Sequence, residues 1–317
     1  MKKNDFCKNL GLIFPGQGSQ RIGMLSDLAK NHSVIIETFK EANDALKYDL
    51  WDLSQNGTKE DILLTERTQP LLLTASVAIW KLWCQLNGPT PGYMAGHSLG
   101  EWSALVCSGV INFDDAVRIV RKRGAYMQNA VPLGEGAMAA VIGLDDEIIK
   151  SVCLESCKGQ EVTAVNFNSP GQVVIAGNKE AVHRAMARCK EIGAKRILPI
   201  PVSAPFHTNL MRPAAQKLSE DINKIKFSAP SIPIVHNINA KTQLEPDSIK
   251  ELMIEQIFKP VLWVDCVKTM VNSGVTNIVE CGAGKVLSGL CKRINSSLCV
   301  YSTEDESALN QTLSSFK

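Results

Sequence analysis

The sequence lacks any apolar run long enough to cross a membrane, for which a helix needs about 20 consecutive apolar residues. The run nearest the N-terminus, from Leu10 to Phe14, contains a glycine and ends at Pro15, so it is too short for the apolar core of a signal peptide. Internal repeats and low-complexity segments are also absent. We therefore expect no membrane partner and predict a cytoplasmic location.

An excess of charge of one sign is missing as well. Lysine and arginine number 34 and aspartate and glutamate 32, which leaves a net charge of +2, so we predict no nucleic-acid partner. The ten cysteines form no C-x-x-C pair, and Cys153 and Cys157 have no partner pair at the spacing of a zinc site. We interpret the cysteines as reduced, mostly buried thiols, and we predict no metal site.

What is present is the composition of an ordinary globular protein of 317 residues, of which 45% are hydrophobic and 21% charged. Up to residue 130 the apolar pattern predicts a strand, a long buried helix with Pro70 in its first turn, a second strand and two helices. Asp114 or Asp115 is the expected cap of the last of these helices. The predicted elements span residues 10–14, 68–86, 93–98, 99–109 and 112–130.

The pattern changes at about residue 130, where the elements follow the order strand, helix, strand, strand, helix, strand. This βαββαβ order is typical of a small ferredoxin-like domain. After residue 200 the mixed pattern of strands and helices returns. We therefore predict an α/β fold in which a larger α/β domain is interrupted by a ferredoxin-like subdomain, with a site in the cleft between them. The predicted domains are residues 1–129 with 200–317, and residues 130–199.

Residues 96–100 read G-H-S-L-G, the G-x-S-x-G pattern that exposes a nucleophilic serine in a strand-to-helix turn. A predicted strand precedes Ser98 and a predicted helix follows it, which favours a nucleophile over a structural serine. Two other glycine-rich turns are poor matches to nucleotide sites. Arg21 stands where a dinucleotide fingerprint needs glycine or alanine, and Val286 stands where a phosphate loop needs serine or threonine.

A serine nucleophile needs a base, for which histidine is favoured over lysine, and the chain offers five histidines. His207 is the first candidate, because it lies in the proline-rich segment PVSAPFHTNL, and catalytic residues often lie on such loops. His236, at the end of a predicted strand, is the second candidate and is also explained as a core or edge histidine. The other three are expected elsewhere: His32 exposed, His97 pointing away from Ser98, and His183 on a solvated helix face.

No acid fits the third position of a catalytic triad. The aspartates between Ser98 and His207 are all at predicted helix starts, where capping explains them: Asp114, Asp115, Asp145 and Asp146. A backbone carbonyl suffices to orient the histidine if the leaving group is easy. A thiolate, with a pKa of about 8.5 for a free cysteine, needs far less protonation than an amine. The missing acid therefore indicates thioester chemistry.

Several segments together resemble a known family, the malonyl-CoA:acyl-carrier-protein transacylases of bacterial fatty acid synthesis. The resemblance covers residues 9–294, and it is specific as a combination although each motif is weak alone. Acyltransferase domains of polyketide synthases share several of these motifs. The matching segments are FPGQGSQ, TQPLLLTASVAIW, AGHSLGEWSAL, RGAYMQ, NFNSPGQVVIAG, PFHTNLM, IFKPVLW and GAGKVLSGLCKRI.

The resemblance implies a role for individual residues. Ser98 matches the nucleophile of the family and His207 its base. The backbone N–H groups of Gln17 and Leu99 match the oxyanion hole. Gln256 matches the glutamine whose backbone carbonyl orients the histidine, which implies an answer to the missing acid.

Two further residues are assigned only by this resemblance. Arg123 matches the arginine that holds the malonyl carboxylate, whereas its own sequence context, Arg121-Lys122-Arg123, favours a solvated basic run. Asn166 matches a position that lines the cleft from the side of the insert. The resemblance also implies a hydrolase-like α/β core, malonyl-CoA and acyl carrier protein as substrate and partner, and no cofactor.

Three alternatives stay open from the sequence. A serine esterase or thioesterase uses the same Ser98 and His207 but does not need Arg123. A non-catalytic protein that binds the carrier retains the fold alone. A polyketide-type acyltransferase acting in trans is the third, and Phe206 beside the histidine leaves it less room for a branched acyl group. Lys195 and Arg196 are expected to meet an acidic carrier protein.

Overall fold

A parallel sheet forms the centre of the larger of two units in the computed structural model, which describes residues 7–202 and 204–316. Five strands lie in the order β7-β2-β1-β8-β9, and every pairing between them is parallel. Phe14, at the end of β1, pairs with Gly96 at the end of β2, so the turns that follow these strands lie side by side. The strands are β1 (Cys7–Phe14), β2 (Pro91–Gly96), β7 (Ile234–Val235), β8 (Asn277–Glu280) and β9 (Cys299–Ser302).

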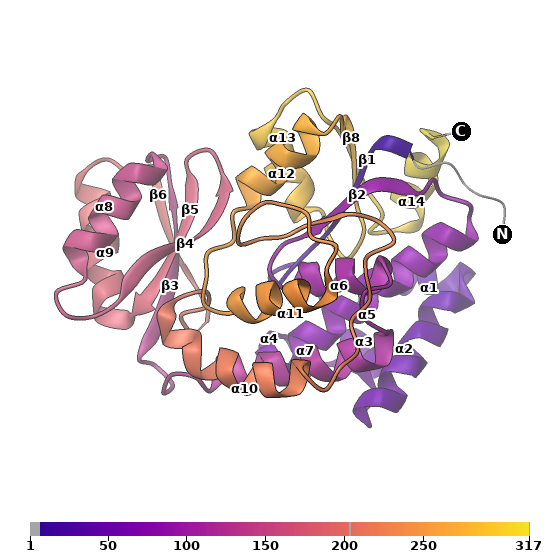
Figure 1. Cartoon of the computed structure of the whole chain (residues 1–317), viewed down its shortest axis with the longest axis horizontal. Coiled ribbons are helices and arrows are strands. Elements are labelled where there is room, and N and C mark those ends of the chain that lie inside the picture. Colours follow the sequence, from indigo (N-terminus) through magenta and orange to yellow (C-terminus); the bar gives the residue numbers. More distant parts are fainter. Residues whose placement is uncertain (1–6, 203, 317) are drawn as a thin grey trace.

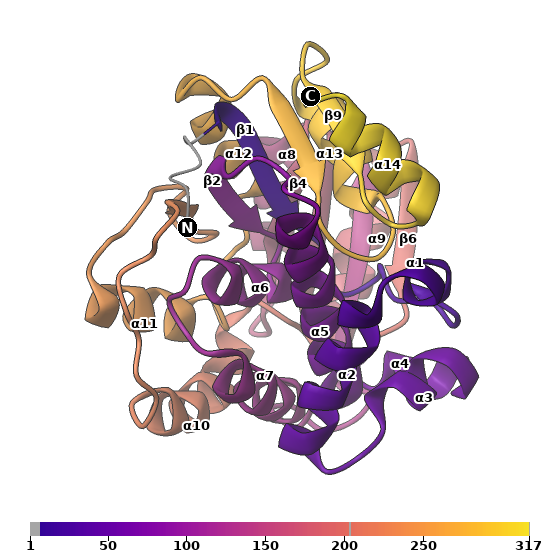
Figure 2. The same cartoon turned by 90° about the vertical axis from the view of Figure 1, so that its right-hand side faces the viewer.

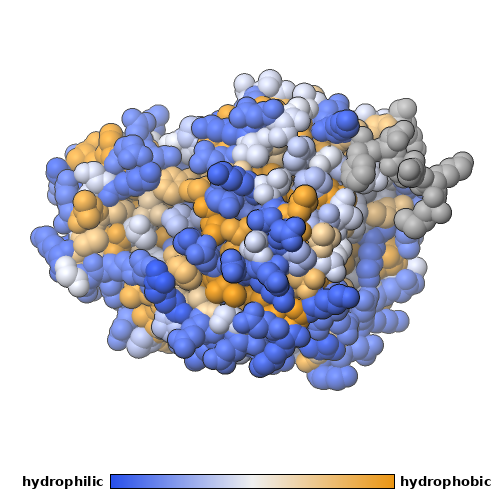
Figure 3. All heavy atoms as spheres, in the orientation of Figure 1, coloured by the Kyte–Doolittle hydropathy of each residue, from blue (hydrophilic) through white to orange (hydrophobic). Residues whose placement is uncertain are grey.

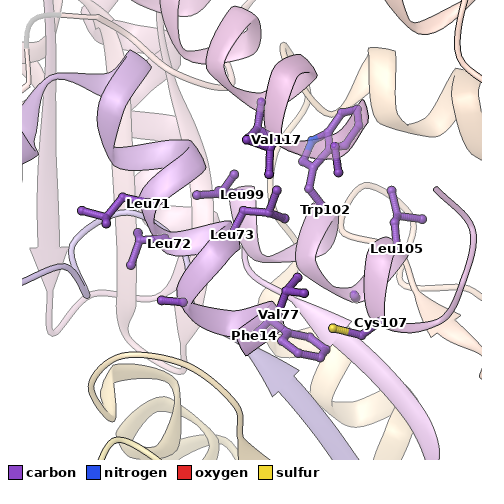
Figure 4. Packing of buried hydrophobic residues seen from close by; sticks show 14 of the residues in the cluster. Phe14, Leu71, Leu72, Leu73, Val77, Leu99, Trp102, Leu105, Cys107 and Val117 are labelled. Carbon is purple, nitrogen blue, oxygen red and sulfur yellow. The ribbon is translucent and has the colours of Figure 1, made fainter. Parts of the chain in front are cut away.

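Both faces of this sheet are buried, as expected for parallel strands. Side chains alternate along β1, so Leu12 and Phe14 join one core cluster and Ile13 joins another. Figure 4 shows part of the first cluster, where Phe14 lies close to Val77 and Cys107, which come from two different helices. The helices of that face are α5 (Thr65–Gln85) and α6 (Leu99–Cys107), and those of the opposite face are α12 (Trp263–Asn272) and α13 (Val286–Ile294).

The remaining helices surround this core, and α7 packs against α5 along much of its length. Figure 2 shows α2, α3 and α4 gathered beside α5, with α10 and α11 on the opposite side. These helices are α1 (Ser26–Asn31), α2 (Ser33–Leu46), α3 (Leu50–Asn56), α4 (Lys59–Leu63), α7 (Phe113–Gln128), α10 (Arg212–Ile222), α11 (Pro246–Glu255) and α14 (Glu306–Ser314), with a short 3₁₀ turn at Asn209–Met211.

The smaller unit is an antiparallel sheet with two helices on one face, at the left of Figure 1. Its strand order, β4-β5-β3-β6, together with the chain order βαββαβ, confirms the predicted ferredoxin-like arrangement. It has a hydrophobic core of its own. The elements are β3 (Gly136–Ile142), α8 (Asp146–Ser156), β4 (Val162–Ser169), β5 (Gln172–Asn178), α9 (Lys179–Glu191) and β6 (Arg196–Ile200).

A backbone bridge joins the two units. The N–H of Val261 donates to the carbonyl of Val165 over 2.8 Å, and the N–H of Phe167 donates to the carbonyl of Val261 over 3.0 Å. Strand β4 therefore continues its hydrogen bonding into the larger unit. The domain boundaries at residues 130 and 199 stay a prediction. The expectation of no signal peptide involves residues 1–6, which lie outside the described residues.

Three local predictions were wrong. Helix α5 begins at Thr65, so Pro70 is its sixth residue, because the polar residues before the proline also adopt helical geometry. The cap of α7 is Asn112, whose side chain accepts the N–H of Asp115, since both aspartates already lie in the first turn. The strand predicted around His236 is only two residues long, Ile234–Val235, and ends before the histidine.

The surface agrees with a globular protein. Figure 3 shows hydrophilic residues over most of the face drawn, with apolar residues visible between them near the middle. Within the described chain, no helix combines the length and the apolar character that a membrane crossing requires.

Candidate active site

Ser98 lies in a sharp turn between β2 and α6, as the G-x-S-x-G pattern predicts. Its backbone angles are φ 50° and ψ −103°, a conformation that residues other than glycine rarely adopt. The N–H of Ser98 donates to Oδ1 of Asn237 over 2.8 Å, and Nδ2 of Asn237 donates to the carbonyl of Gly96 over 2.7 Å. This asparagine therefore holds the strained turn from both sides.

The glycines of the motif allow the turn to close against the sheet. A Cβ atom on Gly100 would lie 2.0 Å from the carbonyl oxygen of Phe14, and a Cβ atom on Gly96 would lie 2.0 Å from the backbone of Gly100. Neither contact is possible, so larger residues would push α6 away from the sheet. The motif is thus a packing requirement as well as a signature.

His207 lies against the serine. Its Nε2 is 2.8 Å from Oγ of Ser98, and its Nδ1 is 2.7 Å from the backbone carbonyl of Gln256. Since a carbonyl only accepts, Nδ1 carries the proton and Nε2 is the acceptor for the serine hydroxyl. Gln256 caps the C-terminus of α11, where carbonyls lack partners in the helix and the dipole is negative. The end of this helix, and not a carboxylate, is therefore the hydrogen-bond partner of Nδ1 of His207.

His207 is held neutral by its surroundings. Burial lowers the pKa of His207 to about 3, and the positive charge of Arg123 adds to this shift, while the hydrogen bond to Gln256 acts in the opposite direction. Only 3% of the residue is exposed. A neutral imidazole at physiological pH is the form that accepts a proton.

A cavity of about 190 Å³ opens over the serine and lies between the two units. It takes residues from the turn after β1, from the nucleophile turn, and from β3, β4 and the end of β6. Asn166 lies in its wall as expected, and the buried Oδ1 of Asn166 has no partner in the described part of the chain. Phe206 narrows the same cavity.

Two backbone positions beside the serine fit an oxyanion hole. Leu99 is the first residue of α6, so its N–H has no acceptor within the helix. Gln17 lies in the turn after β1 and lines the cavity with Ser98. Helix α6 adds the positive end of its dipole at this point. The structure thus brings both predicted residues to the nucleophile.

Arg123 is fully buried beside the nucleophile. Its Nη2 donates to Oγ of Ser98 over 3.2 Å and to Oε1 of Gln256 over 2.9 Å, and its Nη1 donates to Oε1 of Gln69 over 2.8 Å. Burial lowers its pKa to about 10, so the guanidinium remains charged at neutral pH. The solvated basic run that the sequence favoured at this position is wrong.

A buried polar network below the serine escaped the sequence analysis. Glu101 is 1% exposed; its Oε1 is 2.7 Å from Nδ1 of His236, and its Oε2 accepts Nε2 of Gln256 over 2.6 Å. Nε2 of Gln256 also donates to the carbonyl of Ser98 over 2.9 Å. The available signal was a lone carboxylate within the otherwise apolar helix LGEWSALVC.

The other histidines have structural partners. His236 is buried against Glu101, as the interpretation of a core histidine predicts, and His183 is exposed. His97 hydrogen-bonds Asn168 over 2.8 Å instead of Ser98, although it lines the same cavity. The expectation that His32 is exposed was wrong, because its Nε2 lies 2.9 Å from Glu306 in a half-buried pair.

Among the described residues, no group of three or more histidine, cysteine, aspartate or glutamate side chains is arranged to hold a metal ion. All ten cysteines are free thiols.

Comparison with known proteins gives one consistent result. The family model described as acyl transferase domain matches residues 12–294. The malonyl CoA-acyl carrier protein transacylase of Salmonella typhimurium is 54% identical over 301 residues, which are 95% of this chain and 97% of the relative. The protein of the same name from Bacillus subtilis is 42% identical over 309 residues, 97% of each chain.

Solved structures agree with these relatives. The chain is similar to an acyl carrier protein S-malonyltransferase from Vibrio cholerae, with a TM-score of 0.94, 51% identity, and coverage of 96% of this chain and 99% of the other. It is also similar to a malonyl-transacylase in complex with a type II PKS acyl-carrier protein, with a TM-score of 0.96, 50% identity, and coverage of 97% and 99%. The parallel and antiparallel sheets described above are thus the fold of these proteins.

Proposed function

This chain belongs to the acyl transferase family, and on that basis we propose that it moves a malonyl group from malonyl-CoA to the phosphopantetheine thiol of an acyl carrier protein in fatty acid synthesis. The observation that carries the choice of acyl group is Arg123, a buried guanidinium in hydrogen-bond contact with the nucleophile. A fixed cation at this point suits an acyl group that ends in a carboxylate.

The first half-reaction loads the serine. Nε2 of His207 takes the proton of Ser98 as Oγ attacks the thioester carbonyl of malonyl-CoA. The oxyanion of the tetrahedral intermediate accepts hydrogen bonds from the N–H groups of Leu99 and Gln17, and removal of one such donor costs about 3 kcal/mol in other serine enzymes. The carbon–sulfur bond then breaks, and the departing sulfur of coenzyme A takes the proton from His207. Malonyl-Ser98 and a neutral imidazole remain.

The second half-reaction runs the same steps with the other thiol. Neutral His207 accepts the proton of the phosphopantetheine thiol, whose sulfur attacks the malonyl ester of Ser98. The same two amides stabilise the second oxyanion. The carbon–oxygen bond to Ser98 breaks, the serine recovers its proton from His207, and the malonyl thioester of the carrier departs.

Arg123 supplies selectivity for malonyl. Its planar fork can hold a carboxylate with two hydrogen bonds, and its Nε is buried without a partner among the described residues. Hydrogen bonds to charged groups contribute about 1.5–3 kcal/mol each, which favours malonyl over acetyl by tens-fold. The carboxylate also compensates a buried positive charge, which is costly to leave alone.

The proposed reaction exchanges one thioester for another and changes no oxidation state. We therefore propose that the chain uses no redox cofactor and that its chemistry needs no metal. The ten free thiols are consistent with a reducing compartment, which supports the predicted cytoplasmic location.

The test is the intact mass of the protein after brief mixing with malonyl-CoA. One malonyl adduct that disappears in the Ser98→Ala variant, persists in buffer, and moves to an added carrier thiol is the expected result. An adduct that hydrolyses as fast as it transfers indicates a thioesterase, and an absence of any adduct indicates a carrier-binding protein without catalysis. Either outcome contradicts the proposal.

A polyketide-type acyltransferase acting in trans is the second candidate, because one similar structure is a malonyl-transacylase bound to a type II PKS acyl-carrier protein. The same measurement with purified carriers separates the two. Faster malonyl transfer to the fatty acid carrier than to a polyketide carrier supports the first proposal.

A further inference from the structure

Glu101 is a buried carboxylate that the proposed mechanism does not use. It lies in the first turn of α6, where an acidic residue often caps the N-terminal N–H groups of a helix. Its carboxylate does not perform that role here, because Asn237 accepts the N–H of Ser98 instead. Its two carboxylate oxygens instead contact side chains: Oε1 contacts His236, and Oε2 accepts a hydrogen bond from Gln256.

From this arrangement we propose that Glu101 is a positioning residue that fixes the side-chain amide of Gln256 and, through it, holds Arg123 ready for the malonyl carboxylate. The proposal rests on the proposed function, because it concerns the acyl group that Arg123 selects. Glu101 itself touches neither Arg123 nor the reacting atoms.

The first argument is the polarity of the Gln256 amide. A carboxylate only accepts hydrogen bonds, so the amide nitrogen of Gln256 must face Glu101, at 2.6 Å, and it also donates to the carbonyl of Ser98 at 2.9 Å. The amide oxygen is then forced to face Arg123, where it accepts Nη2 at 2.9 Å. With this orientation fixed, the guanidinium is held between Gln256 and Gln69.

The second argument is charge. Arg123 is fully buried, and burial lowers its pKa to about 10, while the negative charge of Glu101 acts in the opposite direction. A carboxylate in direct contact would pair with the guanidinium in the bidentate geometry that the substrate needs. Because a neutral amide separates the two charges, Glu101 stabilises the cation and leaves its donors free for the substrate.

The third argument is the cost of burying Glu101 itself. A buried carboxylate is stable only if it is well paired, and this one has the hydrogen bonds to His236 and Gln256 and a longer one, 3.2 Å, from the N–H of Asn237. Buried charged groups of this kind can often be replaced by apolar residues without loss of stability. A carboxylate at this position therefore suggests a role other than stabilising the fold. Its hydrogen bond to Gln256, whose amide oxygen accepts from Arg123, supplies that role.

The experiment compares acylation of Ser98 by malonyl-CoA and by acetyl-CoA, measured as kcat/KM for each from quenched samples by intact mass. In Glu101→Gln, which keeps the size but loses the charge and the closer of the two obligate acceptors that orient the Gln256 amide, we expect the malonyl-to-acetyl ratio to fall about tenfold relative to the unmodified protein. Glu101→Asp keeps the charge and should retain more of the ratio than Glu101→Gln. A thermal melt of each variant reports folding.

Glu280→Gln is the matched control, because Glu280 is also a fully buried carboxylate, one that accepts N–H groups at the start of α13. It should lower the melting temperature and leave the ratio unchanged. If Glu101→Gln does not fold, Gln256→Leu tests the same relay while keeping the backbone carbonyl that His207 uses, and the ratio should fall similarly.

An unchanged ratio in Glu101→Gln, including the case in which both substrates slow equally, overturns this inference and leaves Glu101 a structural role. An unchanged ratio in Gln256→Leu has the same meaning. Failure of the proposed function gives a different result, because the unmodified protein would then form no malonyl adduct on Ser98.

Discussion

The guanidinium Nη2 of Arg123 lies 3.2 Å from Oγ of Ser98, so a buried cation touches the nucleophile directly. Burial is the main cause that lowers the pKa of His207, and the charge of Arg123 adds to it, so the base is kept neutral. A cation beside Oγ also favours the negative charge that develops there as the proton moves to His207. In the proposed reaction, Arg123 therefore acts on the nucleophile, the base and the acyl group together.

Replacement of Arg123 by lysine tests the fork geometry, since lysine keeps a positive charge but cannot hold a carboxylate with two parallel bonds. We expect kcat/KM for malonyl-CoA to fall by at least tenfold, with a smaller effect on acetyl-CoA. Arg121→Lys, in the same basic run but on the exposed face of α7, is the control and should change neither value. Equal losses for both substrates in Arg123→Lys would remove carboxylate recognition from its role.

Ser98→Gly and Ser98→Ala should both abolish the acyl adduct but differ in stability. Ser98 has φ 50°, a backbone angle that glycine adopts without strain. Alanine keeps the Cβ atom, and this atom makes the same backbone angle unfavourable. A strained residue costs about 1–3 kcal/mol, so we expect Ser98→Gly to be more stable than Ser98→Ala by at least about 1 kcal/mol in denaturant unfolding. Equal stability of the two variants would show that the turn stores no strain.

The pH dependence of stability follows from His207. Its folded pKa of about 3 is below the ordinary value near 6.5, so between these values the unfolded state binds a proton that the folded state does not. The contribution of His207 to the free energy of unfolding is therefore fully present above pH 6.5, and it is lost as the pH drops toward 3. When the pH is lowered from 7 to 4.5, the free energy of unfolding of the unmodified protein should fall by about 2–3 kcal/mol more than that of His207→Gln.

Denaturant titrations of both proteins across this range provide the measurement, and His183→Gln, which changes an exposed histidine, should behave like the unmodified protein. The rate of acylation should also stay level from pH 8 to 6, because His207 does not titrate there. An acid limb near pH 6.5 that belongs to His207 would contradict both expectations.

Lys195 and Arg196 are exposed at the start of β6, whose other end, Ile200, lines the cavity. If they meet an acidic carrier, reversal of both charges to glutamate should slow transfer to the carrier about tenfold and reduce its dependence on salt. Acylation by malonyl-CoA should be unchanged. Lys190→Glu, on the exposed face of α9, is the control; an equal effect of that variant would assign the result to net charge alone.

The sequence predicted the parts of this structure that depend on short segments. The βαββαβ insert follows from the alternation of apolar residues, and the turn at Ser98 follows from its two glycines. His207 was favoured over four other histidines because of its loop context. Each of these inferences uses residues that are neighbours in the chain.

Contacts between distant segments were beyond such reasoning. Asn237 meets Ser98 across 139 positions and Gln256 meets Arg123 across 133, and no local pattern encodes either contact. For Arg123 a signal was present, because it lies three and four positions from the buried residues Val120 and Met127 on one stripe of α7. Helix periodicity shows that such a residue is buried but does not show what it faces.

The bridge at Val261 has a mechanical consequence. Only five positions separate it from Gln256, so one short stretch of backbone carries the acceptor of His207 at one end and the attachment of β4 at the other. A hinge inside this stretch would shift the backbone carbonyl of Gln256 away from His207 each time the cavity opened. Any opening between the two units that leaves the base aligned must therefore pivot about this stretch, with the movement taken up where the chain enters β3 and leaves β6.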